Sequence, residues 1–245
     1  MIPTERQEPS GTDHDDERPQ RRRRTFAARL RAYAISTACV SAILFAIFHR
    51  PLFFENLTPI DARVVRSAQP GENLDDWIQK YQLHSILNLR GGTPADPWYN
   101  DEVKTAKSHN VEFYDYPMIA TRRPLRRDLL TLIDFLRSSP FPLLIHCKHG
   151  ADRTGLAVAI YRMVCLNEPP DRAKQAFSIF HGHIPIAGTQ RLHDPLDEYE
   201  AWLDEQKLPH TPDRFRGWVK DFYQADDPPT DPRPLAAGPR PLARR

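Results

Sequence analysis

A cysteine and an arginine separated by five residues, Cys147 and Arg153, are the pair in this sequence best suited to chemistry. An apolar run at 143–145 precedes the cysteine, and an apolar pattern with helical spacing covers 156–164 after the arginine. A strand, a tight loop and a helix N-terminus in this order form an anion site, because backbone N–H groups point into the loop and the helix dipole favours negative charge. A cysteine at the mouth of that site is expected as a thiolate, which can attack the phosphorus of a bound phosphate.

Each residue of this loop has an expected role. Cys147 is the candidate nucleophile, and the planar guanidinium of Arg153 fits two phosphate oxygens and the charge of a transition state. Gly150 lets the backbone turn so that its amides face the anion. The hydroxyl of Thr154 can donate a hydrogen bond to the sulfur, and His146 is expected to orient the loop from behind. The remaining residues expected to contact the phosphate, from the loop backbone or from its rim, are Lys148, His149 and Ala151.

The stretch 146–155 resembles the signature His-Cys-x5-Arg-Thr-Gly of the cysteine-based phosphatases. The segments 66–70 and 86–90 look like the entry of bacterial and atypical dual-specificity phosphatases. The segment 182–185 and the helical stretch that follows it look like their C-terminal part, so that the resemblance covers Pro59 to Leu203. The resemblance implies the fold of these enzymes, a phosphocysteine intermediate, and neither a metal nor another cofactor.

Strand patterns alternate with helical patterns through the middle of the chain. This alternation predicts an α/β fold, with a mostly parallel central sheet covered by helices on both faces. The active loop then lies at the C-terminal end of its strand, where such sheets bind ligands. Asn73 is expected to cap the first helix of the sheet region. The predicted strands are 64–65, 85–89, 111–116 and 142–146, and the predicted helices are 74–81, 98–109, 125–136, 154–166, 171–180, 194–205 and a short one around Trp218 and Phe222.

The general acid is less clearly marked than the nucleophile. Members of the family use an aspartate on a separate loop, and here Thr121 or Arg122 stands about where that aspartate is expected. Asp115 is near, but it lies in a predicted strand, where a solvated carboxylate is an equally good interpretation. Asp152 stands inside the loop, in a Cys-x-x-Gly-x-Asp-Arg-Thr pattern similar to that of myotubularin-like lipid phosphatases. We favour Asp152 as the acid, while a purely structural role of its carboxylate stays open.

Four arginines lie in or just after the segment in which the acid is expected. If this segment folds as in the family, they lie near the mouth of the site and can attract a polyanionic substrate or an anionic lipid. The alternative is a solvated start of a helix, because exposed arginines are often simply surface residues. The four residues are Arg122, Arg123, Arg126 and Arg127.

A basic block followed by an uncharged apolar segment stands near the N-terminus. Arginines occupy 21–24, and Arg29 and Arg31 precede the 17 uncharged residues of 32–48. We interpret 32–54 as a transmembrane or signal-anchor segment, although 17 residues are at the lower limit for a spanning helix. A cleaved signal peptide would need a small-x-small site, which does not close the run, and a buried helix fits poorly beside the arginines. The positive-inside rule places the N-terminus in the cytoplasm and the catalytic domain outside it.

The two ends of the chain are poor in residues that form a core. We expect a disordered basic tail over 1–31, a phosphatase domain over 55–224, and a Pro-rich disordered tail over 225–245. The net charge of +2 and the lack of interleaved basic and aromatic residues do not call for nucleic acid. The histidines at 181 and 183 lie on a predicted loop, where solvated side chains are more common than metal ligands. The three cysteines, Cys39, Cys147 and Cys165, do not form a disulfide framework.

These observations predict a membrane-anchored, cysteine-dependent phosphatase that hydrolyses phosphomonoesters. Its leading substrate is phosphotyrosine or phosphoserine/threonine on protein, as in the dual-specificity group. The closest alternative is a phosphoinositide or another phospholipid headgroup, which the apolar segment, Lys148, His149 and the Asp152 pattern favour. A module of a different class, which captures phosphate without turnover, is the third interpretation. The oligomeric state stays open.

Overall fold

The computed structural model describes residues 17–53, 55–225, 240 and 241. The chain divides into two units, Met1–Ala46 and Ile47–Arg245. The second unit contains the sheet, the loop with Cys147 and every residue predicted to take part in catalysis.

A six-stranded sheet in the order β1-β2-β5-β3-β4-β6 forms the centre of the second unit. The four inner strands β2, β5, β3 and β4 pair in parallel, whereas β1 and β6 pair antiparallel at the two edges. The predicted mostly parallel α/β sheet is therefore confirmed. Every residue of β2, β3 and β5 is buried, as expected for parallel strands covered on both faces. The strands are β1 Thr58–Pro59, β2 Val64–Ser67, β3 Ser85–Asn88, β4 Glu112–Asp115, β5 Leu143–His146 and β6 Arg240–Pro241.

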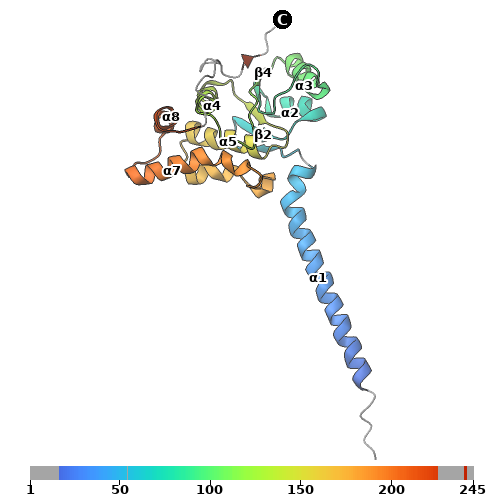
Figure 1. Ribbon diagram of the computed structural model, residues 1–245. Helices are drawn as coiled ribbons and strands as arrows, with labels where there is room; N and C mark the ends of the chain where they lie inside the picture. The colour runs from blue at the N-terminus through green and yellow to red at the C-terminus, as the bar shows by residue number, and fades with distance from the viewer. Residues whose placement is uncertain (1–16, 54, 226–239, 242–245) are drawn as a thin grey trace, which may run out of the picture. The chain divides into compact units, whose positions relative to one another are not determined.

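Helices cover both faces of this sheet. Two of them, α2 and α3, enclose a smaller apolar cluster with one face, while α4, α5, α7 and α8 enclose the larger cluster with the other (Figure 1). Cys147 belongs to the larger cluster, so the reactive loop lies on the face that carries most of the core. The helices of this unit are α2 Leu74–Tyr81, α3 Pro97–Ser108, α4 Arg126–Ser138, α5 Asp152–Cys165, α6 Pro170–Ala173, α7 Asp194–Gln206 and α8 Pro212–Asp221.

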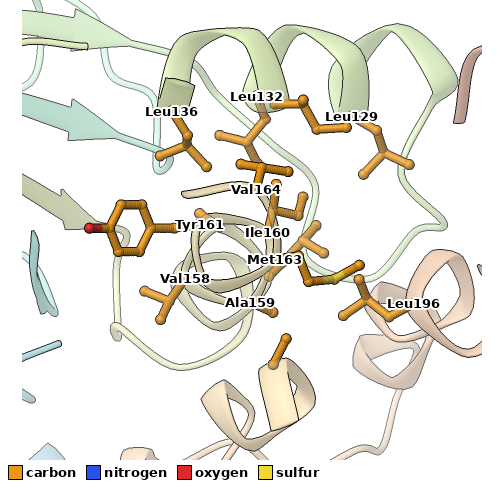
Figure 2. Packing of buried hydrophobic residues seen from close by; sticks show 14 of the residues in the cluster. Leu129, Leu132, Leu136, Val158, Ala159, Ile160, Tyr161, Met163, Val164 and Leu196 are labelled. Carbon is orange, nitrogen blue, oxygen red and sulfur yellow. The ribbon is translucent and has the colours of Figure 1, made fainter. Parts of the chain in front are cut away.

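The helix α5, which follows the reactive loop, is buried along most of its length. Figure 2 shows Leu129, Leu132 and Leu136 of α4 directed toward α5, and Leu196 of α7 close to Met163. All five side chains are fully buried. Truncation of such a leucine to alanine costs about 2–5 kcal/mol. The close packing of α5 against α4 and α7 therefore fixes the position of its first turn, which carries Asp152 and Arg153.

Two local predictions are wrong. The helix expected over 171–180 is interrupted after α6, because Phe177 adopts an extended conformation (φ −84°, ψ 100°). Its ring packs on the rings of His183 and His193 instead, and this tertiary contact overrides local helix preference. Asn73 precedes α2 but makes no side-chain capping bond, since it ends a 3₁₀ turn with helical torsion angles.

The helix α1, Glu17–Phe53, contains the apolar segment near the N-terminus. Its stretch Ala28–Ala46 has 19 residues, is exposed, and is long and apolar enough to cross a membrane; a signal sequence would pass the same test. Residues 17–31 are helical, contrary to the disorder expected for the basic tail, because arginine is a good helix former. Residues 1–16 lie outside the described residues.

At the other end, Arg240 and Pro241 form β6 against β4, where the sequence predicts only a disordered tail. The rest of the predicted tail, 226–239 and 242–245, lies outside the described residues.

Candidate active site

Cys147 lies directly after β5, at the C-terminal end of the central strand, as the sequence predicts. Its side chain is 2 % exposed, and α5 begins five residues later at Asp152. The two following residues, Lys148 and His149, are exposed, whereas Gly150 and Ala151 are buried. The loop therefore has a buried floor at the cysteine and a charged, accessible rim.

Four consecutive carbonyl groups of this loop, at positions 148–151, are directed away from its centre. Each accepts a hydrogen bond from a residue outside the loop: Lys148 O from Gln69 N (3.4 Å), His149 O from Asn56 Nδ2 (3.0 Å), Gly150 O from Arg66 Nη2 (2.7 Å) and Ala151 O from the same Nη2 (3.4 Å). In a planar trans peptide the carbonyl and the following N–H point in opposite directions. The N–H groups of 149–152 are therefore directed into the loop, which is the arrangement expected of an anion site.

Gly150 is required in this loop for two separate reasons. Its φ of +66° lies in the left-handed region that other residues rarely adopt. A Cβ atom at this position would also lie 2.5 Å from Ser67 O and from Ala68 N, which are backbone atoms of the neighbouring strand end. The predicted role of Gly150 in turning the loop fits this geometry.

Arg66 lies under the loop and is fully buried. Besides Gly150 O and Ala151 O, its guanidinium donates to Ala176 O (2.7 Å), while its Nε has no hydrogen-bond partner. Burial lowers the pKa of Arg66 to about 10, and the electrostatic interaction with nearby Cys147 opposes this shift. Arg66 therefore ties the loop to the segment after α6 and places a positive charge near the sulfur. From the sequence, Arg66 was notable only through the family resemblance.

Arg153 lies between the ends of two strands. Its Nη1 donates to Leu89 O (3.2 Å) and to Met118 O (3.3 Å), which follow β3 and β4 respectively. Its Nε is buried and has no partner, so a donor remains for an anion. Thr154 is also buried, and its Oγ1 is without a partner, so the expected hydrogen bond to the sulfur of Cys147 is not formed.

The rim of the site is basic. Burial lowers the pKa of His149, and the neighbouring positive charges of Lys148, Arg153 and Arg90 lower it further, although Asp152 opposes them. Arg90 was not among the predicted site residues. Its guanidinium lies 3.7 Å from the ring centroid of Trp98 and donates to Gln69 Oε1 (3.3 Å), contacts that keep its charge near the loop.

Asp152 is the carboxylate within the loop from Cys147 to Arg153, and a histidine contacts it. Nδ1 of His183 lies 2.7 Å from Asp152 Oδ1, and Nε2 of His183 lies 2.8 Å from Nε2 of His193. His183 is only 5 % exposed, so the expectation of a solvated loop histidine is wrong for this residue. The neighbouring His181 also has a partner, since its Nδ1 lies 3.0 Å from Asn56 Oδ1.

Asp115, the other candidate acid, lies in a network behind the loop. Its Oδ1 accepts from Asn88 Nδ2 (3.0 Å), and its Oδ2 accepts from the Tyr99 hydroxyl (3.3 Å). Burial raises the pKa of Asp115, although the bond from Tyr99 opposes this shift. In the same row of the sheet, fully buried His146 has its Nε2 2.7 Å from Oε1 of Glu102 on α3. Glu102 thus faces His146 from the helix side without a hydrogen bond between these two atoms, and the orienting role of His146 stays a prediction.

Three of the four arginines expected near the mouth are engaged elsewhere. Arg123 donates to Glu198 Oε2 (2.6 Å) and Gln224 O (2.6 Å), Arg126 donates to Tyr223 O (2.7 Å), and Arg127 pairs with Asp128 (3.2 Å). The contacts of Arg123 and Arg126 fasten the start of α4 to α7 and to the segment after α8, so the interpretation as substrate-attracting groups is wrong for these two, whereas the pair of Arg127 and Asp128 lies within α4. Arg122 is exposed.

Residues 55–182, a little over half of the chain, match a family model described as DSP-PTPase phosphatase fused to NAD+ kinase. The chain belongs to this family, and it is a cysteine-based phosphatase of the dual-specificity type.

Named relatives share a larger part of the chain. An inositol diphosphatase, DSP4 of Arabidopsis thaliana, is 28 % identical over 172 residues, which are 65 % of this chain and 77 % of the relative. The inositol diphosphatase DSP1 of Oryza sativa subsp. japonica is 24 % identical over 171 residues, which are 65 % and 69 % of the two chains.

Two solved structures are also similar. TpbA of P. aeruginosa, in complex with pTyr, is 20 % identical with a TM-score of 0.48 and covers 61 % of this chain and 91 % of its own. The core catalytic domain of the PP-IP phosphatase SIW14 from S. cerevisiae is 21 % identical with a TM-score of 0.47, and the covered shares are 64 % and 96 %.

Proposed function

We propose that residues 55–224 form a phosphatase domain that uses Cys147 as nucleophile and acts on a small molecule with several phosphate groups. A diphosphoinositol phosphate is the leading candidate, and phosphotyrosine on protein is the second. The observation that carries the proposal is the loop itself, whose four outward carbonyls leave four amides directed at the position beside Cys147.

The reaction proceeds in two steps. The phosphate docks on the loop amides, and the Cys147 thiolate forms a bond to phosphorus while the bond to the leaving oxygen breaks. Arg153 binds the equatorial oxygens, whose charge grows in the transition state. Asp152 donates its proton to the leaving oxygen, and then accepts a proton from the water that attacks the phosphocysteine. Inorganic phosphate leaves and the thiolate is restored, so that protons and charge balance over the cycle.

The substrate class follows from the rim and from the leaving group. Lys148, His149 and Arg90 can bind phosphates beside the one that reacts, because all three lie around the loop. A phosphoanhydride expels a phosphate whose second pKa is about 6, so it needs less help from an acid than an alkoxide does. This property suits a chain whose segment around Thr121 carries no aspartate. The names of the inositol diphosphatase relatives support the same class.

We further propose that α1 anchors the protein in a membrane through Ala28–Ala46, whose apolar side chains are exposed. The arginines that precede this stretch favour a cytoplasmic N-terminus and an extracytoplasmic phosphatase domain. A C-terminal alkaline phosphatase fusion that is active outside the cytoplasm is the expected result. A C-terminal fluorescent-protein fusion that lights up in the cytoplasm would overturn this orientation.

Steady-state hydrolysis by the full-length reduced protein tests the enzymatic proposal. The substrates are an aryl phosphate, a phosphotyrosine peptide, a phosphothreonine peptide, a phosphoinositide and a diphosphoinositol phosphate, and Cys147→Ser is the control. We expect Cys147-dependent turnover with the highest kcat/KM for the diphosphoinositol phosphate. A preference for the phosphotyrosine peptide would overturn the substrate class alone. Binding of phosphate without turnover of any substrate would overturn the enzyme and favour a phosphate-binding module.

A further inference from the structure

Three side chains far apart in the sequence form one polar chain beside the reactive loop. Asp152 begins α5, His183 follows the 3₁₀ turn Ile179–His181, and His193 immediately precedes α7. The two links measure 2.7 Å and 2.8 Å. The ring of His183 lies 4.9 Å, centroid to centroid, from both the Phe177 ring and the His193 ring, so its orientation is held by packing as well as by bonds.

The partners determine which nitrogen of His183 carries hydrogen. An ionised carboxylate only accepts hydrogen bonds, so Nδ1 of His183 donates to Asp152 Oδ1. In a neutral ring Nε2 then accepts, and its partner His193 supplies the hydrogen from its own Nε2. Burial, followed by the neighbouring His183, lowers the pKa of His193, which favours the uncharged pair.

We propose that His183 is a positioning residue for Asp152: its Nδ1–H occupies Oδ1 and so directs the other oxygen, Oδ2, to the leaving group. The inference rests on the proposed phosphatase function and concerns how its acid is held. A carboxylic acid is effective only when its proton lies within hydrogen-bond reach of the leaving oxygen, and a free aspartate at a helix start samples several rotamers. The fixed ring removes this freedom without placing a full positive charge against the carboxylate.

Substrates that differ in their leaving groups test this inference on the full-length protein. 4-Nitrophenyl phosphate needs little protonation of its leaving oxygen, whereas phenyl phosphate needs more. In Asp152→Asn the ratio of their kcat/KM values, which report the step that expels the leaving group, should rise by about 100-fold, in line with the usual contribution of a general acid. In His183→Ala it should rise by about tenfold. The double variant should show no larger ratio than Asp152→Asn alone, because the two residues act as one unit.

His183→Asn is the matched variant that separates positioning from structure. The amide nitrogen of asparagine is the same number of bonds from Cα as Nδ1 of histidine, so it can donate to Asp152. We expect it to restore most of the ratio. Equal losses with both substrates in His183→Ala, together with a lower Tm, or no rescue by asparagine in a folded variant, would overturn the inference. An unchanged ratio in Asp152→Asn would do so too, while Cys147-dependent turnover would leave the proposed function in place.

Discussion

Asp152 and Asp115 are two carboxylates near the C-terminal edge of the same sheet, yet their surroundings differ. Asp115 ends a strand and is held by two neutral donors, the Asn88 amide and the Tyr99 hydroxyl, while burial raises its pKa. Asp152 lies in the first turn of α5, within the loop from Cys147 to Arg153, and contacts His183. A perturbed pKa taken alone would select Asp115 as the acid. The position of Asp152 beside the loop N–H groups instead selects Asp152 as the acid.

The comparison extends to the groups around each carboxylate. Behind the loop, His146 and Glu102 are nearly fully buried and face each other across the sheet and α3, next to the strand end that carries Cys147. In front, Arg153, Lys148 and His149 lie around the loop itself. The front cluster can touch a substrate, whereas the rear cluster can act only through the loop. Substitutions in the two clusters should therefore have effects that differ in kind, direct or through the loop, as well as in size.

The largest effect is expected at Cys147, which the front cluster surrounds. Cys147→Ser should reduce turnover of every substrate to background, because the hydroxyl is a far weaker nucleophile than a thiolate. Cys165→Ser is the matched control: this thiol lies at the far end of α5 and contacts Leu136 O (3.2 Å). The control should keep wild-type kcat and KM, and comparable losses in the two variants would contradict the assignment of the nucleophile.

Arg153→Lys comes next in size and tests the front cluster a second time. Lysine keeps the charge but loses the planar fork, so kcat/KM should fall by about 10²–10³-fold. Arg122→Lys makes the same exchange at an exposed position and should leave kcat/KM within about twofold. Steady-state kinetics with the aryl phosphate measure both. A change within about twofold in both variants would show that a positive charge alone suffices at position 153, and would contradict the role of the planar fork.

Asp152→Asn and Asp115→Asn compare the two carboxylates directly. With phenyl phosphate, we expect kcat to fall by about 100-fold for Asp152→Asn and by less than about threefold for Asp115→Asn. The asparagine at 115 keeps a carbonyl oxygen for the Asn88 amide, so the rear network stays connected. The reverse order of effects would transfer the acid role to Asp115 and end the preference for position over pKa.

The smallest effect is expected on stability, and it tests how the groups behind the loop hold Asp115. Because burial raises the pKa of Asp115 above 3.8, the folded protein binds more protons than the unfolded chain just above that pH. The free energy of unfolding therefore falls as pH rises through the folded pKa, and Asp115→Asn removes this loss. The free energy of unfolding of the variant minus that of wild type should therefore be larger near pH 7 than near pH 3. Thermal melts at both pH values measure this, and the opposite trend would mean that the carboxylate is stabilised when charged.

Local sequence predicts the strand, loop and helix around Cys147 well, because each rests on short-range signals. The apolar run before the cysteine, the glycine at 150 and the helical pattern after Arg153 all lie within about 20 residues of one another. The alternation of strands and helices along the chain likewise predicts the parallel sheet. These features need no knowledge of distant contacts.

Distant contacts explain what the sequence does not show. Asn56 and Arg66 bind loop carbonyls more than 80 residues away in the chain, so neither can be assigned this role from local pattern. His183 is expected to be solvated, because nothing near it in the sequence reveals that Phe177 and His193 bury its ring. The arginines at 123, 126 and 127 look available until the segment after α8 and the side chains of Asp128 and Glu198 are placed against them.

The central claim is that Cys147 carries the phosphate during turnover and that Asp152, rather than Asp115, assists its removal. Acid quenching of the full-length protein during hydrolysis of a ³²P-labelled substrate tests both parts. We expect covalent label on the peptide that contains Cys147, more label in Asp152→Asn because water is less well activated, and unchanged label in Asp115→Asn. Turnover without label on Cys147, or accumulation in Asp115→Asn instead, would contradict it.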